Sequence, residues 1–434
     1  MVNKSSSGVD VLVVGAGVIG SAAALALSKA GHSVLVVERG RAVGHGSTAS
    51  SAGIIRIHAA DAQSCRLAAE ATGIWENWGS FVESTSAEPL ARFQRCGSVI
   101  LDTGYGYVGT VAAALEEAGQ PFERWDAERL KERLPFADLR RFGPPRSVED
   151  SGFWAEPSEY LAGALYTAES GYVADPALAA ANLMDAACRH GARLMVGERV
   201  RSLRISGDRI TGVLLADGRQ LTAGAVLVAA GPHTDALLRT VAATEDFNVR
   251  TRRIREELHH IPVPPSIDVA RDGVHLVDGD LGINLRPESG NAFLVGGDGV
   301  SVDGETRVPD PDVFDPQVSG PAWERNTLRL ARRFPEVGVP GRRRGVVGLY
   351  DVTDDWLPIY DRTGIDGLFV AMGTSGNQFK TAPLVGELLR QIIELALDGV
   401  DHTTVPLTNP LTGTTYQSAQ FSRLRVPATG GSRG

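Results

Sequence analysis

Three glycines near the N-terminus have the spacing of a turn that binds a pyrophosphate. Gly15, Gly17 and Gly20 follow the apolar run 11–14 and precede an alanine-rich segment that ends near Gly31. In a G-x-G-x-x-G turn the first glycine permits the bend, the second lets backbone approach the pyrophosphate, and the third lets helix pack on strand. The helix N-terminus also attracts anions, because its first N–H groups have no partner inside the helix. The spacing therefore predicts a dinucleotide site.

An acidic residue ends the next apolar run. Residues 33–37 are typical of a strand, and Glu38 follows them directly. In a strand–helix–strand unit, a carboxylate at this place accepts hydrogen bonds from the adenosine ribose and repels a 2′-phosphate. The expected ligand is FAD or NAD and not NADP. The turn and its acid do not choose between these two.

A loop rich in small residues and hydroxyl groups, residues 39–53, comes after Glu38. An ordinary NAD domain would proceed at this point to its next helix. The hydroxyl groups of Ser47, Thr48 and Ser50, with backbone N–H groups nearby, are suited to line an extended diphosphate. The alternative is a solvated linker, because clusters of glycine and serine between regular segments are commonly loops.

Two later glycine turns also follow apolar runs. The run 225–228 leads to Gly231, and the run 368–371 leads to the segment 373–380. A helix is predicted over 385–396, where apolar residues recur every three or four positions. Because ligands of open α/β sheets bind at the carboxyl ends of the strands, both turns are candidates for the cofactor site. Lys380 beside the second turn is either a ligand-binding or a solvated lysine.

The order of the elements predicts a parallel α/β sheet with a β-meander beside it. Strand, helix and strand across residues 11–37 specify a right-handed βαβ unit. Asp175 and Pro176 mark the start of another helix, as an N-cap acid and a first-turn proline. The β-prone runs of the expected meander are 194–196, 200–205, 209–216 and 221–222.

Composition excludes several classes of protein. The 434 residues predict two or three structural units. A formal net charge of −9 has the wrong sign for a protein that neutralises many phosphates, so no nucleic-acid partner is expected. The three cysteines form no C-x-x-C pair, and His259, His260 and His275 have no acidic neighbour at metal-ligand spacing. We expect no metal and a reducing, cytoplasmic location.

We expect neither a signal peptide nor a membrane span in the N-terminal region. Residues 1–8 are polar and lack an apolar core, which is typical of a disordered leader. Residues 11–28 carry no charge, at the lower edge of what spans a bilayer. Their strand, glycine turn and helix pattern favours the βαβ unit instead.

Two regions differ in character and indicate a second domain. Residues 89–150 are rich in charges and loops, and residues 241–340 combine β runs with proline turns. We expect them to form a substrate domain inserted into a discontinuous FAD-binding domain of residues 1–88, 151–240 and 341–421. The basic, glycine-rich residues 422–434 are expected to be a flexible tail.

In their order along the chain, these segments resemble the D-amino-acid oxidase superfamily of flavoproteins. The resemblance covers nearly the whole chain and is strongest to the sarcosine oxidase and glycine oxidase branch, which oxidises C–N bonds of amino acids and secondary amines with FAD. It implies an α/β fold with a GR2-type, Rossmann-like FAD-binding domain and an antiparallel-sheet substrate domain. The segments that carry it are the Gly15 turn with Glu38, Gly53-Ile54-Ile55-Arg56, Ala229-Ala230-Gly231-Pro232, Gly348-Leu349-Tyr350-Asp351 and 373–380.

The resemblance also implies which residues do the chemistry. The family places the substrate carboxylate on an arginine and a lysine, which match Arg56 and Lys380. A guanidinium fork and an ammonium point charge would hold the α-carbon against flavin N5, to which hydride is transferred. Tyr350 matches an aromatic position at the substrate, with core packing as its alternative. Further expected cofactor contacts are Arg39, Val200, Gly231, Gly348, Gly373, Gly376, Asn377 and Gln378.

Three departures from the family pattern bear on the chemistry. Gly348 stands where monomeric sarcosine oxidases have the cysteine that links the flavin, so FAD is expected to be bound non-covalently. Leu294 stands where those oxidases use a lysine to activate O₂, which leaves a dehydrogenase with another acceptor open. Asp298 replaces a histidine and is expected to be a turn residue, with binding of a basic amine as its alternative, and Gly53 replaces an arginine.

The sequence thus predicts an FAD-dependent oxidoreductase acting on a C–N bond of an amino acid or secondary amine, with an imine product that hydrolyses. Its partners would be that small molecule and O₂ or another electron acceptor. One alternative is an FAD-dependent dehydrogenase of 2-hydroxy acids or polyols, which usually requires a general base such as histidine. Another is a non-catalytic FAD-binding subunit of an electron-transfer complex.

Overall fold

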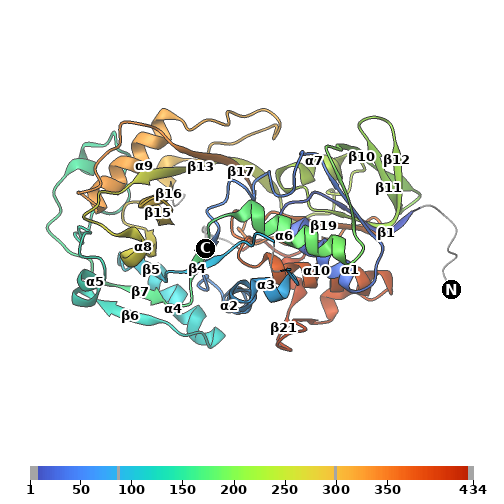
Figure 1. Ribbon diagram of the computed structural model, residues 1–434, viewed down its shortest axis with the longest axis horizontal. Coiled ribbons are helices and arrows are strands. Elements are labelled where there is room, and N and C mark those ends of the chain that lie inside the picture. Colours follow the sequence, from blue (N-terminus) through green and yellow to red (C-terminus); the bar gives the residue numbers. More distant parts are fainter. Residues whose placement is uncertain (1–7, 86–87, 298–300, 429–434) are drawn as a thin grey trace.

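The computed structural model describes residues 8–85, 88–297 and 301–428, and Asp298 lies outside them. Figure 1 shows two groups of elements side by side. One group is built on a mixed eight-stranded sheet whose centre is parallel, and the other on a largely antiparallel eight-stranded sheet. This is the α/β arrangement that the sequence predicts.

The first sheet contains the predicted βαβ unit. Strand β1 (Val9–Val14) lies parallel to β2 (Val34–Glu38), and helix α1 (Val18–Lys29) connects them. On the other side of β1 lie β12 (Gln220–Val228) and β19 (Leu368–Met372), also parallel. Because β1, β12 and β19 run in one direction, the glycine turns that follow them emerge at the same edge of the sheet.

The expected meander is partly wrong. Strand β9 (Arg193–Val196) pairs in parallel with β2, because helix α6 (Pro176–Arg189) precedes it and a helical crossover delivers a parallel strand. The meander consists of β10 (Val200–Ser206), β11 (Arg209–Leu215) and the first part of β12. The two β-prone runs predicted within 221–228 form one continuous strand.

Helices α1, α6 and α10 (Ala382–Leu397) pack beside one another over the first sheet (Figure 1). Helices α1 and α10 approach closely, since a Cβ on Gly386 would collide with the backbone of Ala22. Asp175 caps α6 as predicted, because its side chain accepts a hydrogen bond of 2.9 Å from the Leu178 N–H. In the described parts of the chain, no helix is both long and apolar enough to cross a bilayer.

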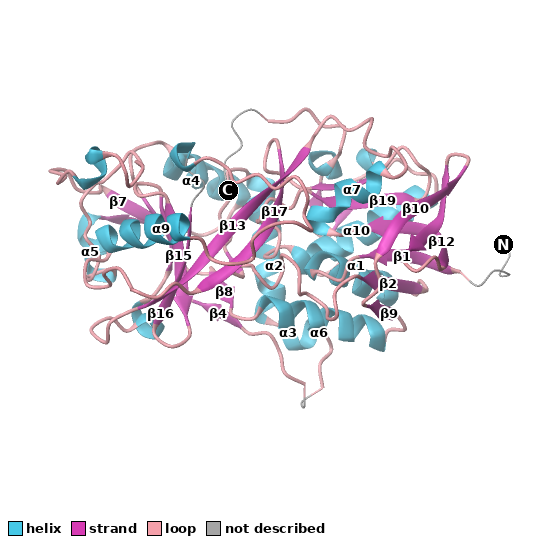
Figure 2. Ribbon diagram, turned by 90° about the horizontal axis from the view of Figure 1, so that it is seen from above, coloured by secondary structure: helices cyan, strands magenta, loops and turns pink. Residues whose placement is uncertain are grey.

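The second sheet crosses the centre of Figure 2 with its longest strands. Among its described strands, only β14 (His275–Asp278) and β5 (Ser98–Leu101) pair in parallel. Strands β7 (Gly163–Thr167) and β17 (Gly345–Thr353) pair within this second sheet, although the expected boundaries assign both to the FAD-binding domain. The domain boundaries themselves stay a prediction. The order of this sheet is β17 (Gly345–Thr353), β13 (Thr251–Pro262), β16 (Ala292–Gly297), β15 (Ile283–Glu288), β14 (His275–Asp278), β5 (Ser98–Leu101), β7 (Gly163–Thr167) and β6 (Glu123–Asp126).

Smaller elements complete the two groups. The helices are α2 (Ala62–Glu76), α3 (Trp78–Phe81), α4 (Tyr107–Ala118), α5 (Ala127–Arg133), α7 (Thr234–Arg239), α8 (Val269–Asp272) and α9 (Gly320–Arg333). The strands are β3 (Ile54–Ile55), β8 (Gly171–Val173) and β4 (Phe93–Arg95) of a small sheet, the pair β20 (Leu407–Thr408) and β21 (Thr415–Tyr416), and the edge strand β18 (Ile359–Arg362).

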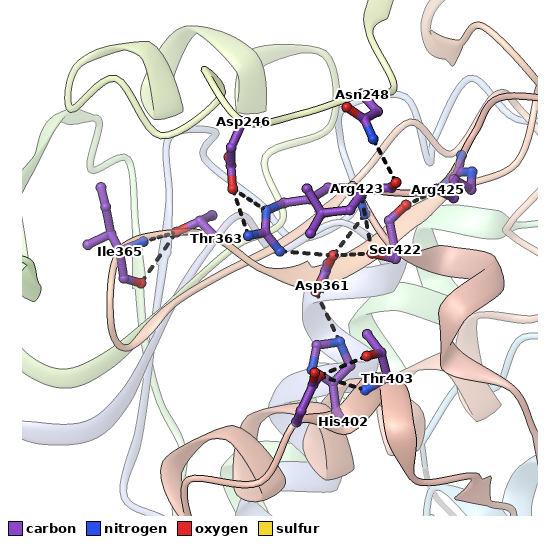
Figure 3. A network of polar contacts seen from close by, with 12 residues as sticks. Asp246, Asn248, Asp361, Thr363, Ile365, His402, Thr403, Ser422, Arg423 and Arg425 are labelled. Carbon is purple, nitrogen blue, oxygen red and sulfur yellow. Dashed lines mark hydrogen bonds and ion pairs between the residues drawn. The ribbon is translucent and has the colours of Figure 1, made fainter.

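The segment 422–425 is fixed to the fold and is not a flexible tail (Figure 3). The Arg423 Nη2 atom lies 2.7 Å from Asp246 Oδ2, and the Arg423 backbone N–H donates to Asp361 Oδ2 at 2.8 Å. Arg425 Nε lies 2.8 Å from the buried Asp355. The expectation of a free tail is therefore wrong for these residues, because their basic side chains meet carboxylates distant in sequence.

Candidate active site

The N-terminus of α1 is shaped to admit an anionic ligand. Gly15 has φ +104°, and a Cβ there would lie 2.5 Å from the Ala229 oxygen, while a Cβ on Gly20 would collide with the Gly15 oxygen. A Cβ on Gly17 would meet only Thr48 Oγ1, at 3.3 Å, so the space in front of it is open. The first turn of α1 holds no acidic residue. These features fit a pyrophosphate.

Glu38 and Thr48 fix the backbone around this turn. Glu38 accepts hydrogen bonds from the N–H groups of Ala16, at 2.8 Å, and Gly40, at 2.6 Å. Thr48 Oγ1 accepts one from the Val18 N–H at 3.1 Å. Both residues lie where the predicted ligand would bind. The contact of Glu38 with a ribose stays a prediction.

Ser47 and Ser50 join the loop to the second sheet. The Ser47 hydroxyl donates to the Leu349 oxygen at 2.7 Å and the Ser50 hydroxyl to the Val347 oxygen at 2.9 Å. Both hydroxyl groups therefore face β17 in this structure, and a contact of these residues with a diphosphate stays a prediction. A Cβ on Gly348 would lie 2.7 Å from Ser50 Cβ, so the glycine permits this close approach of loop and strand.

The other expected cofactor residues lie at or near the same sheet edge. Gly231 has φ +53° and follows Ala230, whose Cα lies 3.1 Å from the Cβ position of Gly15. Val200 is buried at the start of β10. Arg39 Nη1 lies 2.5 Å from Asp312 Oδ1. Gln378 Oε1 accepts hydrogen bonds from Tyr360 and Thr381.

A pocket lies between one face of the second sheet and the glycine segment after β19. Its walls bring together Arg56, Tyr350, Gly376, Asn377 and Lys380 and enclose about 870 Å³ of atom-free space, part of it open to solvent. Neighbours across the sheet, Val277, Asn284, Gly296 and Leu258, all line it. Residues directly opposite each other on adjacent strands share a face, so this face forms one wall.

A partly buried arginine, Arg56, and a buried lysine, Lys380, occupy one end of the pocket. Arg56 donates to the His58 oxygen at 2.9 Å and to Asn377 Oδ1 at 3.0 Å, and Lys380 Nζ donates to the Asn377 oxygen at 2.8 Å. Burial, followed by the charge of Arg56, lowers the pKa of Lys380 well below its usual value. Within the described residues neither cation forms an ion pair with a carboxylate. An incoming carboxylate would supply the missing counter-ion.

Neighbouring residues hold this end of the pocket in place. The Trp75 indole N–H of α2 donates to the Lys380 oxygen at 2.7 Å, and its ring stacks on Phe379 at 5.1 Å between centroids. Asp351 of β17 accepts hydrogen bonds from the Gly373 N–H at 2.6 Å and the Thr374 hydroxyl at 2.7 Å. Burial raises the pKa of Asp351 in spite of these hydrogen bonds. Sequence reasoning gave neither Trp75 nor Asp351 a positioning role.

Tyr350 lies against the glycine segment. Gly376 has φ +70°, and a Cβ there would collide with the Tyr350 ring. The ring also lines the pocket. The two interpretations that the sequence left open are therefore compatible, since the ring packs close to Gly376 while the residue borders the pocket.

Sequence reasoning missed two histidines of the pocket, His58 and His275. Both are buried and line the pocket, with their rings stacked at 6.2 Å between centroids. His275 Nδ1 lies 2.7 Å from the Ser98 hydroxyl, whereas neither ring nitrogen of His58 has a hydrogen-bond partner among the described residues. Burial, then the charge of Arg56, lowers the pKa of His58 well below 6.5 and that of His275 to about 3. Burial therefore favours the uncharged form of both imidazoles.

A spacing signal for His58 was available in the sequence. His58 follows Arg56 by two residues in a segment that continues the short strand β3. Side chains two positions apart in extended chain point to the same side. A residue that shares a face with the predicted carboxylate ligand was therefore a candidate for the pocket.

Comparison with known proteins defines the class. A family model described as FAD dependent oxidoreductase matches residues 10–392, and the chain belongs to this family. It is 27% identical to the glycine oxidase of Geobacillus kaustophilus, over 92% of this chain and 96% of that protein. It is 25% identical to the sarcosine oxidase subunit beta of Rhodobacter capsulatus, over 88% and 84%.

Solved structures support the same fold. The L-proline dehydrogenase of P. horikoshii superposes with a TM-score of 0.75 at 19% identity, covering 96% of this chain and 97% of that one. The family resemblance and the fold class read from the sequence are confirmed, and with them the assignment of FAD as cofactor.

Proposed function

We propose that the protein oxidises the C–N bond of an amino acid or secondary amine by hydride transfer to FAD, giving an imine that hydrolyses. The observation that carries this is the pair of cations Arg56, which is partly buried, and Lys380, which is buried, whose contacts in the described chain are to neutral oxygens. The names of the relatives, glycine oxidase and sarcosine oxidase among them, support the same substrate class.

Each residue then has a physical role. Arg56 offers a planar fork to the carboxylate and Lys380 a point charge, which together orient the α-carbon. Trp75 and Asp351 fix the backbone that bears Lys380, and the second sheet covers one side of the pocket. The Gly15 turn with Thr48 would hold the pyrophosphate, and bound FAD supplies the hydride acceptor.

Three finer points belong to the same proposal. FAD is held non-covalently, since Gly348 has no side chain to form a link, and acid precipitation would release it into solution. The electron acceptor is O₂ or another oxidant. Leu294 on β16 offers no cation to favour O₂ reduction, which supports an acceptor other than O₂. The location is cytoplasmic, in keeping with free Cys65, Cys96 and Cys188.

An anaerobic titration tests the substrate class. N-methyl, cyclic and D-amino acids are added to the FAD-loaded protein, and loss of the oxidised flavin absorbance is followed. At least one of these amines should bleach the flavin, and admission of air then reports on O₂ use. Failure of every amine, with intact flavin binding, would contradict the proposal.

A specific observation favours one second candidate, oxidation of a 2-hydroxy acid on the same scaffold. Removing hydride from a C–OH carbon requires a base for the hydroxyl proton. His58 is a buried imidazole whose ring nitrogens have no hydrogen-bond partner among the described residues, and burial lowers its pKa. Including 2-hydroxy acids in the titration separates the two. Bleaching by a hydroxy acid, without bleaching by the matching amino acid, would decide for this candidate.

A further inference from the structure

A turn from the second group of elements reaches the expected nucleotide site. The Asp312 N–H donates to Asp310 Oδ1 at 2.9 Å, and the Val313 N–H to the Asp310 oxygen at 3.0 Å, which closes a tight turn over 310–313. The preceding chain is tied to β13, since the Val308 N–H donates to the Arg253 oxygen at 3.0 Å. The turn is therefore held in a defined position.

The Asp312 carboxylate contacts three basic side chains. Its oxygens lie 2.5 Å from Arg39 Nη1, 2.9 Å from Arg199 Nη2 and 3.0 Å from His233 Nε2. Arg39 is itself expected to contact the cofactor, and Arg199 and His233 lie within two residues of such positions. Arg39 follows Glu38, Arg199 precedes Val200, and His233 follows the Gly231 turn. One carboxylate thus joins three segments at the nucleotide edge of the first sheet.

The basic neighbours of Asp312 keep its carboxylate ionised. Burial alone would raise the pKa of Asp312, but hydrogen bonds from Arg39 and His233 outweigh it and bring the pKa to about 2. Burial and the charge of Arg39 lower the pKa of His233, whose ring Nε2 lies 3.0 Å from the carboxylate. Without Asp312, the cations of Arg39 and Arg199 would face each other without this anion between them.

A third arginine couples the turn to the Gly231 segment. Arg253 of β13 donates to the Pro309 oxygen at 2.7 Å and to the Pro232 oxygen at 2.7 Å, and it lies 3.1 Å from Asp235. The backbone before Asp312 and the backbone after Gly231 are therefore held by one side chain. A displacement of the turn would disturb the segment that borders the cofactor.

We propose that Asp312 is a positioning residue of the FAD site, which fastens the turn 310–313 across Arg39, Arg199 and His233 and thereby slows the release of FAD. This role rests on the Gly15 turn and its neighbours being the FAD site. It adds a contribution from the second group of elements to a site formed mainly by the first.

The test measures release of FAD from the full-length protein, without using catalysis. Rates are followed by the rise of free-FAD fluorescence after dilution, and affinities by titration of the apoprotein. Asp312→Asn should release FAD about tenfold faster, corresponding to a tenfold weaker binding if association is unchanged. Raising the salt concentration should accelerate release from the wild type more than from the variant.

Asp272→Asn is the matched control. Asp272 is equally exposed, at 27% of its side chain, and pairs with Arg271 at 2.6 Å in α8. It should release FAD like the wild type. Equal rates for Asp312→Asn and the wild type, or an equal acceleration in Asp272→Asn, would overturn the proposal.

A second variant keeps the test decisive if Asp312→Asn folds poorly. Arg199→Gln removes one of the three contacts and leaves the carboxylate in place. It should accelerate release by a smaller factor, and its effect should vanish in the Asp312→Asn background. Independent effects of the two changes would contradict the role of Asp312. A wild type that binds no FAD would instead refute the proposed function.

Discussion

The Nη2 atom of Arg56 donates a hydrogen bond of 3.0 Å to Oδ1 of Asn377, although 321 positions separate the two residues in the sequence. Asn377 also accepts the hydrogen bond from Lys380 through its backbone oxygen. One asparagine therefore sets the distance between the two cations, and the glycine segment after β19 positions both partners of a carboxylate.

Removing either cation should weaken the binding of carboxylate ligands. A charge-assisted hydrogen bond contributes about 1.5–3 kcal/mol, so Arg56→Ala and Lys380→Ala should each raise the dissociation constant roughly 10- to 100-fold. The measurement is the change in flavin spectrum on titration with an unreactive carboxylate. Lys29→Ala, which removes a surface lysine paired with Glu83 at 2.7 Å, should have no effect. Unchanged binding in both pocket variants would remove these residues from the site.

Gly376→Ala should disturb the pocket beyond the cost of its backbone angle. Its Cβ would collide with the Tyr350 ring, whereas Gly413 has a similar φ, +77° against +70°, and open space around its Cβ position. Both alanine variants carry the strain of a positive φ, of order 1 kcal/mol. Only Gly376→Ala should also change carboxylate binding, measured by the same titration. Identical behaviour of the two variants would show that Tyr350 is not held by this contact.

His58→Leu should make the protein more stable and its substrate binding weaker. The change removes two buried nitrogens that have no partner among the described residues, and such groups cost about 1–3 kcal/mol each. His259→Leu is the control, because His259 is also buried with unpartnered nitrogens but does not line the pocket. Both variants should raise the melting temperature, and only His58→Leu should weaken substrate binding. A loss of stability in His58→Leu would contradict this description.

Asp361→Asn should destabilise the protein by about 3–5 kcal/mol, the range for breaking a buried ion pair. Asp361 is 1% exposed and lies 3.0 Å from His402 Nε2 and 3.2 Å from Arg423 Nη1 (Figure 3). Chemical denaturation measures the change. Asp366→Asn is the control, since Asp366 is exposed and its ion pair with Arg209 contributes about 0–1 kcal/mol. A loss no larger than the control's would contradict the buried network.

The same carboxylate gives a pH dependence with a defined sign. Burial raises the pKa of Asp361, but the contact with His402 Nε2 and the hydrogen bond that Asp361 accepts from the Arg423 backbone N–H outweigh it and lower the pKa below 3.8. Its contribution is therefore full above the unfolded value, about 3.9, and is lost as pH falls below it. The wild type should lose more free energy of unfolding between pH 5 and pH 3 than Asp361→Asn does. Parallel curves would contradict the assignment.

Local signals in the sequence predicted the glycine turns correctly. At Gly15 and Gly20 the backbone itself excludes any Cβ, so the residue type is set by contacts within one βαβ unit. Arg56, Tyr350 and Lys380 were placed by family resemblance, and the pocket brings them together.

Sequence reasoning missed contacts whose partner lies far away in sequence. The hydroxyl groups of Ser47 and Ser50 bind β17, about 300 positions later, and Arg423 binds Asp246. No periodic pattern in the sequence indicates which distant residue each of these side chains contacts. The parallel pairing of β9 with β2 was missed for a related reason, since strand propensity does not encode strand order.

The most direct test is a crystal structure of the FAD-loaded protein with an unreactive carboxylate ligand. The account predicts FAD along the Gly15, Gly231 and Gly373 turns, and the carboxylate within about 3 Å of both Arg56 and Lys380. A ligand whose carboxylate lies elsewhere in the pocket, with these two cations still bound only to Asn377 and His58, would contradict it.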